Sequence, residues 1–185
     1  MLRIEPITSL DAPELEPYRT MRRSEEHRHR QIFVAEGEKV VRRLLESSLP
    51  VVSVILPEKW MQEYRPLLER RPEVITAYLA EKDLLENLVG FSMYQGVLAI
   101  GRIPRLPTLA EVIGASTSPR LFVALDALTN AENLGGLVRN CAGFGVQALL
   151  IGNTSSSPYL RRSVRGSMGT VFKIPVVENL DLPSA

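Results

Sequence analysis

From residue 31 onward, the apolar positions of the chain change period repeatedly, and glycine, proline or charged residues stand at each change. Short continuous apolar runs are typical of buried strands, whereas apolar positions three and four residues apart are typical of one face of a helix. In the first half, the pattern predicts strands at 31–35, 51–56, 74–78 and 96–100, with helices at 40–45, 58–68 and 84–88 between them. Strands that alternate with helices in this way predict an α/β fold with a largely parallel sheet.

The pattern is interrupted at residues 102–119, which hold Pro104, Pro107, Pro119 and a cluster of serine and threonine. This composition is typical of a linker, with room for one short helical turn. The pattern then resumes, and it predicts strands at 121–125, 148–151 and 171–175, a helix at 132–144 and a short basic helix before the last strand. We therefore expect a first domain at 1–101, a linker at 102–119 and a second domain at 120–185.

The composition narrows the class of protein. Hydrophobic residues make up 45% and charged residues 23% of the 185 positions, which is typical of a globular protein. No apolar run approaches the roughly 18 to 20 residues of a membrane span, and residues 1–20 mix acids and prolines, unlike a signal peptide. We therefore expect a cytoplasmic protein without membrane contact. The single cysteine, Cys141, excludes an internal disulfide. Because the chain has only two histidines, His27 and His29, we also expect no metal site of the usual cysteine and histidine kind.

Positive charge is concentrated in the second half, although the whole chain carries a net charge of only +1. Residues 120–175 hold 6 basic and 2 acidic residues, a local excess of +4. Arg161, Arg162, Arg165 and Lys173 stand in a stretch without an acid. Such a stretch favours a local site for phosphate groups, and a solvated basic surface is the alternative.

The segment 126–141 carries the densest group of candidate functional residues, and it lies between a predicted strand and a predicted helix. Open α/β sheets bind ligands beyond the carboxyl ends of their strands, where this loop must lie. Gly135 and Gly136 allow a close backbone approach in the first helical turn, whose free N–H groups attract an anion. Arg139 follows one turn later and can reach back over the same end. The alternative is an asparagine-rich cap with small residues for helix packing.

Three groups of residues resemble one known family. The motif Asn130-x-x-Asn133-Leu134-Gly135-Gly136-Leu137-x-Arg139-Asn140-Cys141-Ala142, followed by Phe144-Gly145, resembles the first conserved motif of the SpoU/TrmH-type RNA 2′-O-ribose methyltransferases. The next family segment is similar to Ser157-Pro158-Tyr159, Val164-Arg165-x-Ser167-x-Gly169, Phe172 and Ile174-Pro175, in the same order. The small RNA-binding domain that often precedes this fold resembles the first half, at Phe33-Val34-x-Glu36-Gly37 and Gln95-Gly96-Val97.

The resemblance implies the fold and the activity. It implies a small ribosomal-protein-like α/β RNA-binding domain, followed by the first part of an α/β-knot (SPOUT) methyltransferase domain. It also implies methyl transfer from S-adenosylmethionine to a ribose 2′-hydroxyl of rRNA or tRNA, by a homodimer in a complete family member. The family's two later motifs, which form the cofactor pocket and the knot, do not occur in the 185 residues. We therefore expect an incomplete and inactive portion of such an enzyme, without the cofactor pocket.

Two other functions stay open. A non-enzymatic RNA-binding protein is favoured by the missing cofactor motifs. A small-molecule or nucleotide-binding α/β domain is favoured only by the general strand–loop–helix pattern.

The resemblance also assigns roles to individual residues. It implies Asn133 and Arg139 as catalytic residues. We expect RNA contacts by Arg161, Arg162, Arg165 and Ser167, with a solvated basic surface as the alternative for the arginines. We also expect RNA contacts by Arg28 and Arg30, which lie in a basic run that Glu25 and Glu26 interrupt, with a solvated helix as the alternative. Because a guanidinium is a poor base at neutral pH, we expect Arg139 to hold a phosphate in a bidentate manner, and Asn133 to hold Arg139 or the ribose. An ion pair of Arg139 with Glu132 or Asp126 is the alternative.

Overall fold

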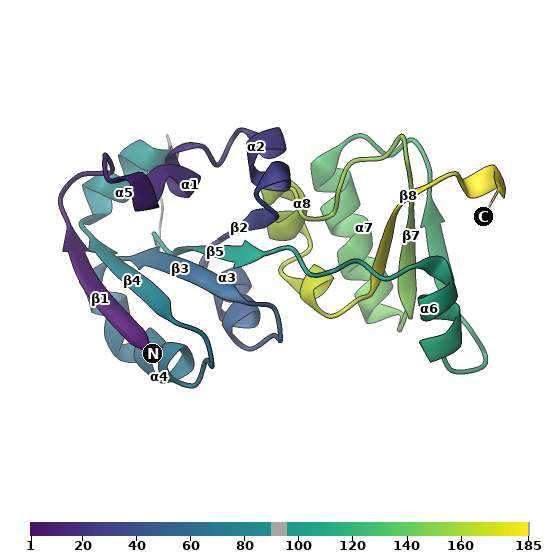
Figure 1. Cartoon of the computed structure of the whole chain (residues 1–185), viewed down its shortest axis with the longest axis horizontal. Coiled ribbons are helices and arrows are strands. Elements are labelled where there is room, and N and C mark those ends of the chain that lie inside the picture. Colours follow the sequence, from purple (N-terminus) through teal and green to yellow (C-terminus); the bar gives the residue numbers. More distant parts are fainter. Residues whose placement is uncertain (90–95, 185) are drawn as a thin grey trace. The chain divides into compact units, whose positions relative to one another are not determined.

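The computed structural model describes residues 1–89 and 96–184 and contains two compact units, Met1–Ile103 and Pro104–Ala185 (Figure 1). Gln95, which belongs to one of the resembling motifs, lies outside the described residues. No helix within the described ranges is both long enough and apolar enough to cross a membrane.

The amino-terminal unit is a mixed α/β unit. Its elements, in chain order, are β1 (Leu2–Ile7), η1 (Pro13–Leu15), α1 (Glu16–Arg19), α2 (Ser24–His29), β2 (Ile32–Glu36), α3 (Glu38–Leu45), β3 (Val51–Leu56), η2 (Glu58–Trp60), α4 (Met61–Glu69), β4 (Ile75–Ala80), α5 (Lys82–Val89) and β5 (Leu98–Arg102). The strands form one sheet in the order β1-β4-β3-β5-β2.

The sheet is largely parallel as expected, with the exception of one strand, β5. Strands β1, β4 and β3 are parallel, whereas β5 runs antiparallel to both β3 and β2. The apolar pattern predicts that a segment is a strand, but it carries no information on the direction in which the strand runs. The pattern also missed β1, because exposed Pro6 breaks the alternation of this edge strand.

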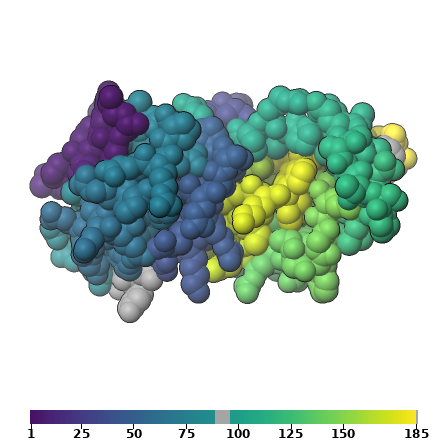
Figure 2. All heavy atoms as spheres, turned by 90° about the horizontal axis from the view of Figure 1, so that it is seen from below, coloured from purple at the N-terminus to yellow at the C-terminus, as the bar shows by residue number. Residues whose placement is uncertain are grey.

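Helices cover both faces of this sheet, because side chains along each strand alternate between the faces. Ile32 and Val34 face the core that contains α1 and α5. The opposite face carries α3 and α4, whose atoms are turned toward the viewer in Figure 2. On that face the ring of Phe33 lies over Gly101, where an added Cβ would stand 2.5 Å from the ring. Gly101 therefore provides the space that the aromatic ring fills.

A nearly buried arginine holds the turn between α3 and β3. The side chain of Arg71 is 9% exposed and donates hydrogen bonds to the carbonyls of Leu45 (3.1 Å), Ser47 and Leu49 (2.7 Å). It also pairs with Glu73 at 2.7 Å, and the same carboxylate oxygen accepts from the Val51 N–H at 2.8 Å. Burial alone would raise the pKa of Glu73, but the hydrogen bonds from Arg71 and the Val51 N–H outweigh it and lower that pKa.

The carboxy-terminal unit has a parallel sheet in the order β6-β7-β8. Its elements are α6 (Leu109–Ala115), β6 (Phe122–Leu125), α7 (Ala131–Gly143), β7 (Ala148–Gly152), α8 (Arg161–Gly166), η3 (Thr170–Phe172), β8 (Val176–Leu180) and η4 (Leu182–Ser184). Val112 of α6 packs with Ala148 and Val177 on one face of the sheet. α7 runs back from the carboxyl end of β6 toward the amino end of β7, so its first turn lies at the carboxyl edge of the sheet.

Two segments of this unit differ from the expectation. The strand expected at 171–175 is wrong: Val171 and Phe172 lie in η3, and the strand begins at Val176. Their side chains are buried, and a short buried apolar run does not by itself distinguish a strand from a helical turn. The segment 102–119 contains α6, which begins with a capping box between Thr108 and Glu111.

The arrangement around Arg71 predicts a large loss of stability on its removal. Arg71→Ala leaves three backbone carbonyls and the Glu73 carboxylate without their donor, and should lower the free energy of unfolding by about 3 kcal/mol. Trp60, the only tryptophan, lies in the same unit, so its fluorescence during urea unfolding measures the effect. The exposed neighbour Arg70 is the control, and Arg70→Ala should stay within about 0.5 kcal/mol of wild type. Equal effects of the two changes would contradict the buried role.

Candidate functional site

The first turn of α7 is fixed by a side-chain cap at the carboxyl edge of the sheet. Asn130 is the N-cap, and its Oδ1 accepts hydrogen bonds from the N–H groups of Glu132 (2.9 Å) and Asn133 (3.0 Å). An asparagine in this position satisfies backbone donors that the helix itself cannot pair. The cap therefore determines where the helix begins and places Asn133 on its first turn.

The two adjacent glycines of α7 have different surroundings. A Cβ on Gly135 would lie 2.5 Å from the carbonyl oxygen of Ser163 and 2.9 Å from the Cα of Gly166, so this glycine allows α7 and α8 to touch. A Cβ on Gly136 would meet nothing within 4 Å. The expectation that both glycines admit a ligand is wrong for Gly135, whose close approach is to α8. Gly136 alone is open on the outer side of the helix.

Asn133 and Arg139 both lie on the exposed side of α7. They are six residues apart, which is about 9 Å along the helix axis. Long helical side chains lean toward the amino end of their helix, so Arg139 leans toward the turn that carries Asn133. Within residues 1–89 and 96–184, the Arg139 side chain makes no hydrogen bond or ion pair, including none with Asn133.

The alternative ion pairs of Arg139 are not formed, because both acids have other partners. The Glu132 carboxylate lies 3.7 Å from Arg165 on α8. Asp126 Oδ1 accepts hydrogen bonds from the Thr154 hydroxyl at 2.9 Å and from the Ala127 N–H at 3.0 Å. The guanidinium of Arg139 is therefore available to an external anion.

The three arginines of α8 lie on one side of this short helix. With 3.6 residues per turn, Arg161, Arg162 and Arg165 fall within an arc of about 100°. Arg162 is exposed and the other two are half-buried. The side chain of Arg165 is 41% exposed and its charge is partly neutralised by Glu132. Arg162 and Arg161 therefore supply most of the positive charge that α8 offers to an anion.

Ser167, expected to contact RNA, is fully buried. Its hydroxyl donates to the Val164 carbonyl at 2.8 Å and accepts from the Gly169 N–H at 3.1 Å. Direct contact of this side chain with RNA is therefore incompatible with the structure, and the expectation is corrected. Ser167 instead stabilises the turn that ends α8.

Arg28 and Arg30 belong to the amino-terminal unit, at the end of α2. Both are exposed, and Arg30 pairs with Glu16 at 2.6 Å. His27, which directly precedes Arg28, is buried, and its Nε2 lies 3.1 Å from the Thr20 hydroxyl. Burial lowers the pKa of this histidine. The histidine therefore belongs to the packing of α1 against α2, while the arginines lie on the surface.

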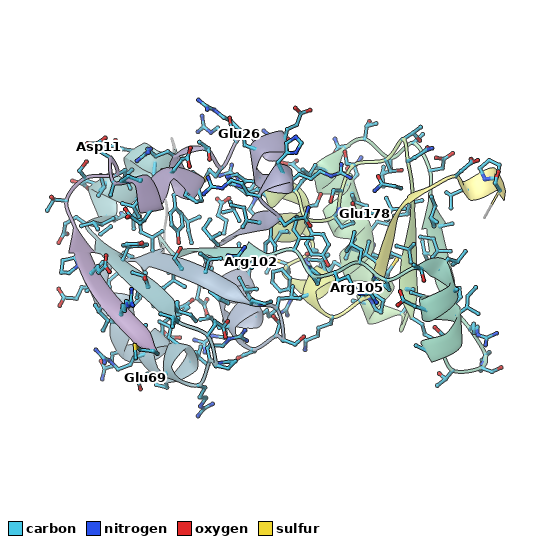
Figure 3. All side chains as sticks on the ribbon, viewed as in Figure 1. Asp11, Glu26, Glu69, Arg102, Arg105 and Glu178 are labelled. Atoms are coloured by element: carbon cyan, nitrogen blue, oxygen red, sulfur yellow. The ribbon has the colours of Figure 1, made fainter. Side chains whose placement is uncertain are left out.

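A set of hydroxyl groups at the carboxyl edge was missed by sequence reasoning. Thr154, Ser155 and Ser156, named here the hydroxyl bridge, follow β7 and bond to the loop that leads into α7. Three consecutive hydroxyl residues after a strand were the available signal, but a polar loop is expected in any case at such a position. Farther along the same edge, Ser157 donates to Glu178 of β8 at 2.6 Å (Figure 3).

A shallow groove of about 490 Å³ lies at the opposite, amino edge of this sheet. Its walls include Val112, Val146 and Lys173, and Arg105, labelled in Figure 3, pairs there with Glu111 at 2.6 Å. The Arg105 guanidinium lowers the pKa of the Glu111 carboxyl to about 2. Of the basic residues expected to form a phosphate site, Lys173 lies in this groove, whereas Asn133, Arg139 and the arginines of α8 do not line it. Among the residues that the structure describes, no cluster of three histidine, cysteine or acidic residues could hold a metal ion.

The carboxy-terminal unit combines a parallel sheet with an asparagine-capped helix at its carboxyl edge. On that helix lies Arg139, which has no partner among the described residues. The sequence of this unit is similar to that of one class of proteins. The family model of the SpoU rRNA methylases matches residues 120–185. A tRNA/rRNA methyltransferase of Mycobacterium tuberculosis, named as uncharacterized, is 30% identical over 188 residues, which cover 99% of this chain and 63% of the relative. A 23S rRNA (guanosine-2′-O-)-methyltransferase of Nitrosomonas europaea is 34% identical over 74 residues, 40% of this chain and 28% of the relative.

Solved structures agree on the fold. The AdoMet-bound rRNA methyltransferase from Sinorhizobium meliloti has a TM-score of 0.81 at 20% identity, covering 97% of this chain and 66% of that chain. The SpoU methyltransferase AviRb from Streptomyces viridochromogenes, in complex with AdoMet, has a TM-score of 0.74 at 20% identity, covering 94% of this chain and 65% of that chain. Residues 120–185 are therefore similar in sequence to the SpoU rRNA methylase family. The chain spans slightly less than two thirds of these longer relatives.

Replacing each of the two glycines by alanine should have opposite effects on the free energy of unfolding. Gly135→Ala should lower the free energy of unfolding by about 2 to 3 kcal/mol, because its Cβ meets backbone atoms of α8. Gly136→Ala should raise it by about 0.5 to 1 kcal/mol, because alanine is the better helix former and its Cβ meets nothing. Urea unfolding of the whole chain, followed by circular dichroism, measures both. A stable Gly135→Ala variant would show that α7 and α8 are not closely packed.

Proposed function

We propose that this chain acts in RNA 2′-O-ribose methylation, with rRNA or tRNA as the substrate. The observation that carries the proposal is Arg139, an exposed cation without a partner among the described residues, on the helix whose first turn presents Asn133. The relatives' names as tRNA/rRNA methyltransferases support the same substrate class. The cytoplasm as its location and assembly as a homodimer are part of this proposal.

Physical chemistry limits what each residue does in such a reaction. A ribose 2′-hydroxyl must lose its proton as it attacks a methyl group, and a guanidinium does not accept that proton at neutral pH. Arg139 therefore holds the phosphate beside the target ribose by two hydrogen bonds and stabilises the negative charge that develops on the attacking oxygen. Asn133, on the first turn of the same helix, hydrogen-bonds the ribose.

S-adenosylmethionine is the methyl donor that the family implies. In the hydroxyl bridge, the hydrogens of Thr154, Ser155 and Ser156 all point at oxygens of the protein, namely Asp126 Oδ1 and the carbonyls of Leu125 and Thr129. The described residues of this edge therefore do not fit the donor by themselves, and we assign no step of the reaction to it.

RNA binding in this proposal has two parts. Arg161, Arg162 and Arg165 contact phosphates next to the target nucleotide. Arg28 and Arg30 contact the RNA elsewhere, and they belong to the amino-terminal domain that the sequence predicts at 1–101. A non-enzymatic RNA-binding protein is the second candidate, favoured by the internal bonding of the hydroxyl bridge. The two are distinguished by transfer of labelled methyl groups to rRNA or tRNA transcripts, which only the first candidate catalyses.

Salt dependence of RNA binding tests the role of α8. Phosphate contacts release counterions, so the logarithm of affinity should fall linearly with the logarithm of salt concentration. Replacing Arg161, Arg162 and Arg165 by alanine should reduce this slope by about 2 to 3, with Arg165 contributing least because of Glu132. The matched control removes three exposed positive charges on or beside α4, at Lys59, Arg65 and Arg70. An equal reduction in both variants would indicate a general charge effect, not a contact of α8.

Arg139 is tested by steady-state methyl transfer in a longer chain that also carries the family's two later motifs, which do not occur in these 185 residues. As a bidentate phosphate ligand acting mainly in the transition state, its change to alanine should lower kcat and kcat/KM together by about 10² or more. The melting temperature should stay nearly unchanged, because no partner within the described residues is lost. Arg139→Lys keeps the charge without the planar fork and should not restore turnover. Turnover of the lysine variant within about threefold of wild type would reduce the role of this residue to a simple positive charge.

A further inference from the structure

The loop between β6 and α7 is held by the hydroxyl bridge along its whole length. The Thr154 hydroxyl donates to Asp126 Oδ1 at 2.9 Å and accepts from the Ala127 N–H at 3.2 Å. The Ser155 hydroxyl accepts from the Leu128 N–H and donates to the Leu125 carbonyl, both at 3.2 Å. The Ser156 hydroxyl donates to the Thr129 carbonyl at 2.6 Å, and the Ser156 N–H donates to the Leu128 carbonyl at 2.9 Å. Consecutive hydroxyls thus bond consecutive residues of the loop.

The loop is held in a conformation that its own residues do not favour. Ala127 has a φ of 53°, in the left-handed region that is unfavourable for a residue with a Cβ. Its N–H is bonded by both Asp126 Oδ1 and Thr154 Oγ1, which compensates for the cost. Such outliers persist only where the surroundings determine them, and they concentrate at functional sites.

Gly152 provides the space for the contact between Asp126 and Thr154. A Cβ on Gly152 would lie 2.6 Å from Asp126 Oδ1, so only glycine at this position allows the carboxylate to reach Thr154. The loop ends at Asn130, the cap of α7, and Ser163 of α8 donates to the Ala131 carbonyl at 2.9 Å directly after it. The position of the first helical turn is therefore determined by bonds from the segments after β7.

We propose that Asp126 and Thr154 are positioning residues, which fix the Ala127 loop and so hold Asn133 in the orientation that faces the RNA. Asp126 acts through the acceptor oxygen Oδ1, not through its charge. The inference rests on the proposed function, because it takes the first turn of α7 as the part that meets the ribose.

The test compares two pairs of variants in the whole chain. Asp126→Ala and Thr154→Val remove the hydrogen bond between Asp126 and Thr154, whereas Asp126→Asn keeps an acceptor oxygen without the charge, and Thr154→Ser keeps the hydroxyl. Ser116→Ala, which removes a hydroxyl bonded to the Val112 carbonyl at 2.7 Å elsewhere in the unit, is the control. Amide hydrogen exchange at Ala127 and Leu128 should become about tenfold faster in the first two variants only.

A second readout follows Asn133 itself. The NMR signal of its side-chain amide is recorded during titration with a short RNA hairpin. RNA should shift this signal in wild type, Asp126→Asn, Thr154→Ser and Ser116→Ala, and the affinity at this signal should fall about tenfold in Asp126→Ala and Thr154→Val.

The outcomes separate the two proposals. Unchanged exchange in Thr154→Val overturns the positioning role, whatever the RNA titration shows. Faster exchange with an unchanged Asn133 titration also overturns it, since the bridge would then be structural only. A loss in Asp126→Asn equal to that in Asp126→Ala would show that the charge acts. Absence of any Asn133 shift in wild type contradicts the proposed function, and the exchange measurement still decides whether the bridge orders the loop.

Discussion

The contact of α7 with α8 at Gly135 and Gly166 is the constraint on which the rest of the carboxy-terminal unit depends. A Cβ on Gly166 would lie 3.2 Å from the Glu132 carbonyl, and one on Gly135 only 2.5 Å from the Ser163 carbonyl, so the two backbones touch. Because the backbones touch, Ser163 can reach the Ala131 carbonyl and Arg165 can reach Glu132. The same contact brings the arginines of α8 next to the first turn of α7, which concentrates positive charge at the carboxyl edge of the sheet.

Backbone contact alone would not fix the loop before α7, because Asp126, Ala127 and Thr129 are exposed and their polar groups could bond to water in several conformations. The hydroxyl bridge supplies partners for these groups from the loop after β7. The hydrogen bond between Thr154 and Asp126 holds the start of the loop after β6, and the Asn130 cap holds its end at α7. Rigidity at this place has a functional consequence, since a group that must meet a ribose needs to be held to within a fraction of an ångström.

The sequence predicts the parts of this structure that depend on burial. Strand β3 lies at 51–56 as expected, because its apolar run is covered on both faces of the sheet. Properties that depend on distant partners are not visible in the pattern: the antiparallel direction of β5, the edge strand β1, and the buried turn at Val171. The site divides in the same way. Asn133 and Arg139 come from the family resemblance and the exposure of a helix face follows from spacing, whereas the burial of Ser167 and the packing role of Gly135 depend on α8.

The charge pattern around Arg139 differs from that around Arg42 and Arg65. Arg42 has Glu38 four residues before it, and Arg65 has Glu69 four residues after it, so each pairs within its own helix. The corresponding positions around Arg139 are Gly135, Gly136, Ala142 and Gly143, none of which carries a charge. No acid occurs between Glu132 and Glu178, and Glu132 already faces Arg165. At Gly135 the contact with α8 leaves no room for any side chain. At the other three positions an acid is absent, so the charge of Arg139 is not compensated within its own helix, as the proposed phosphate contact requires.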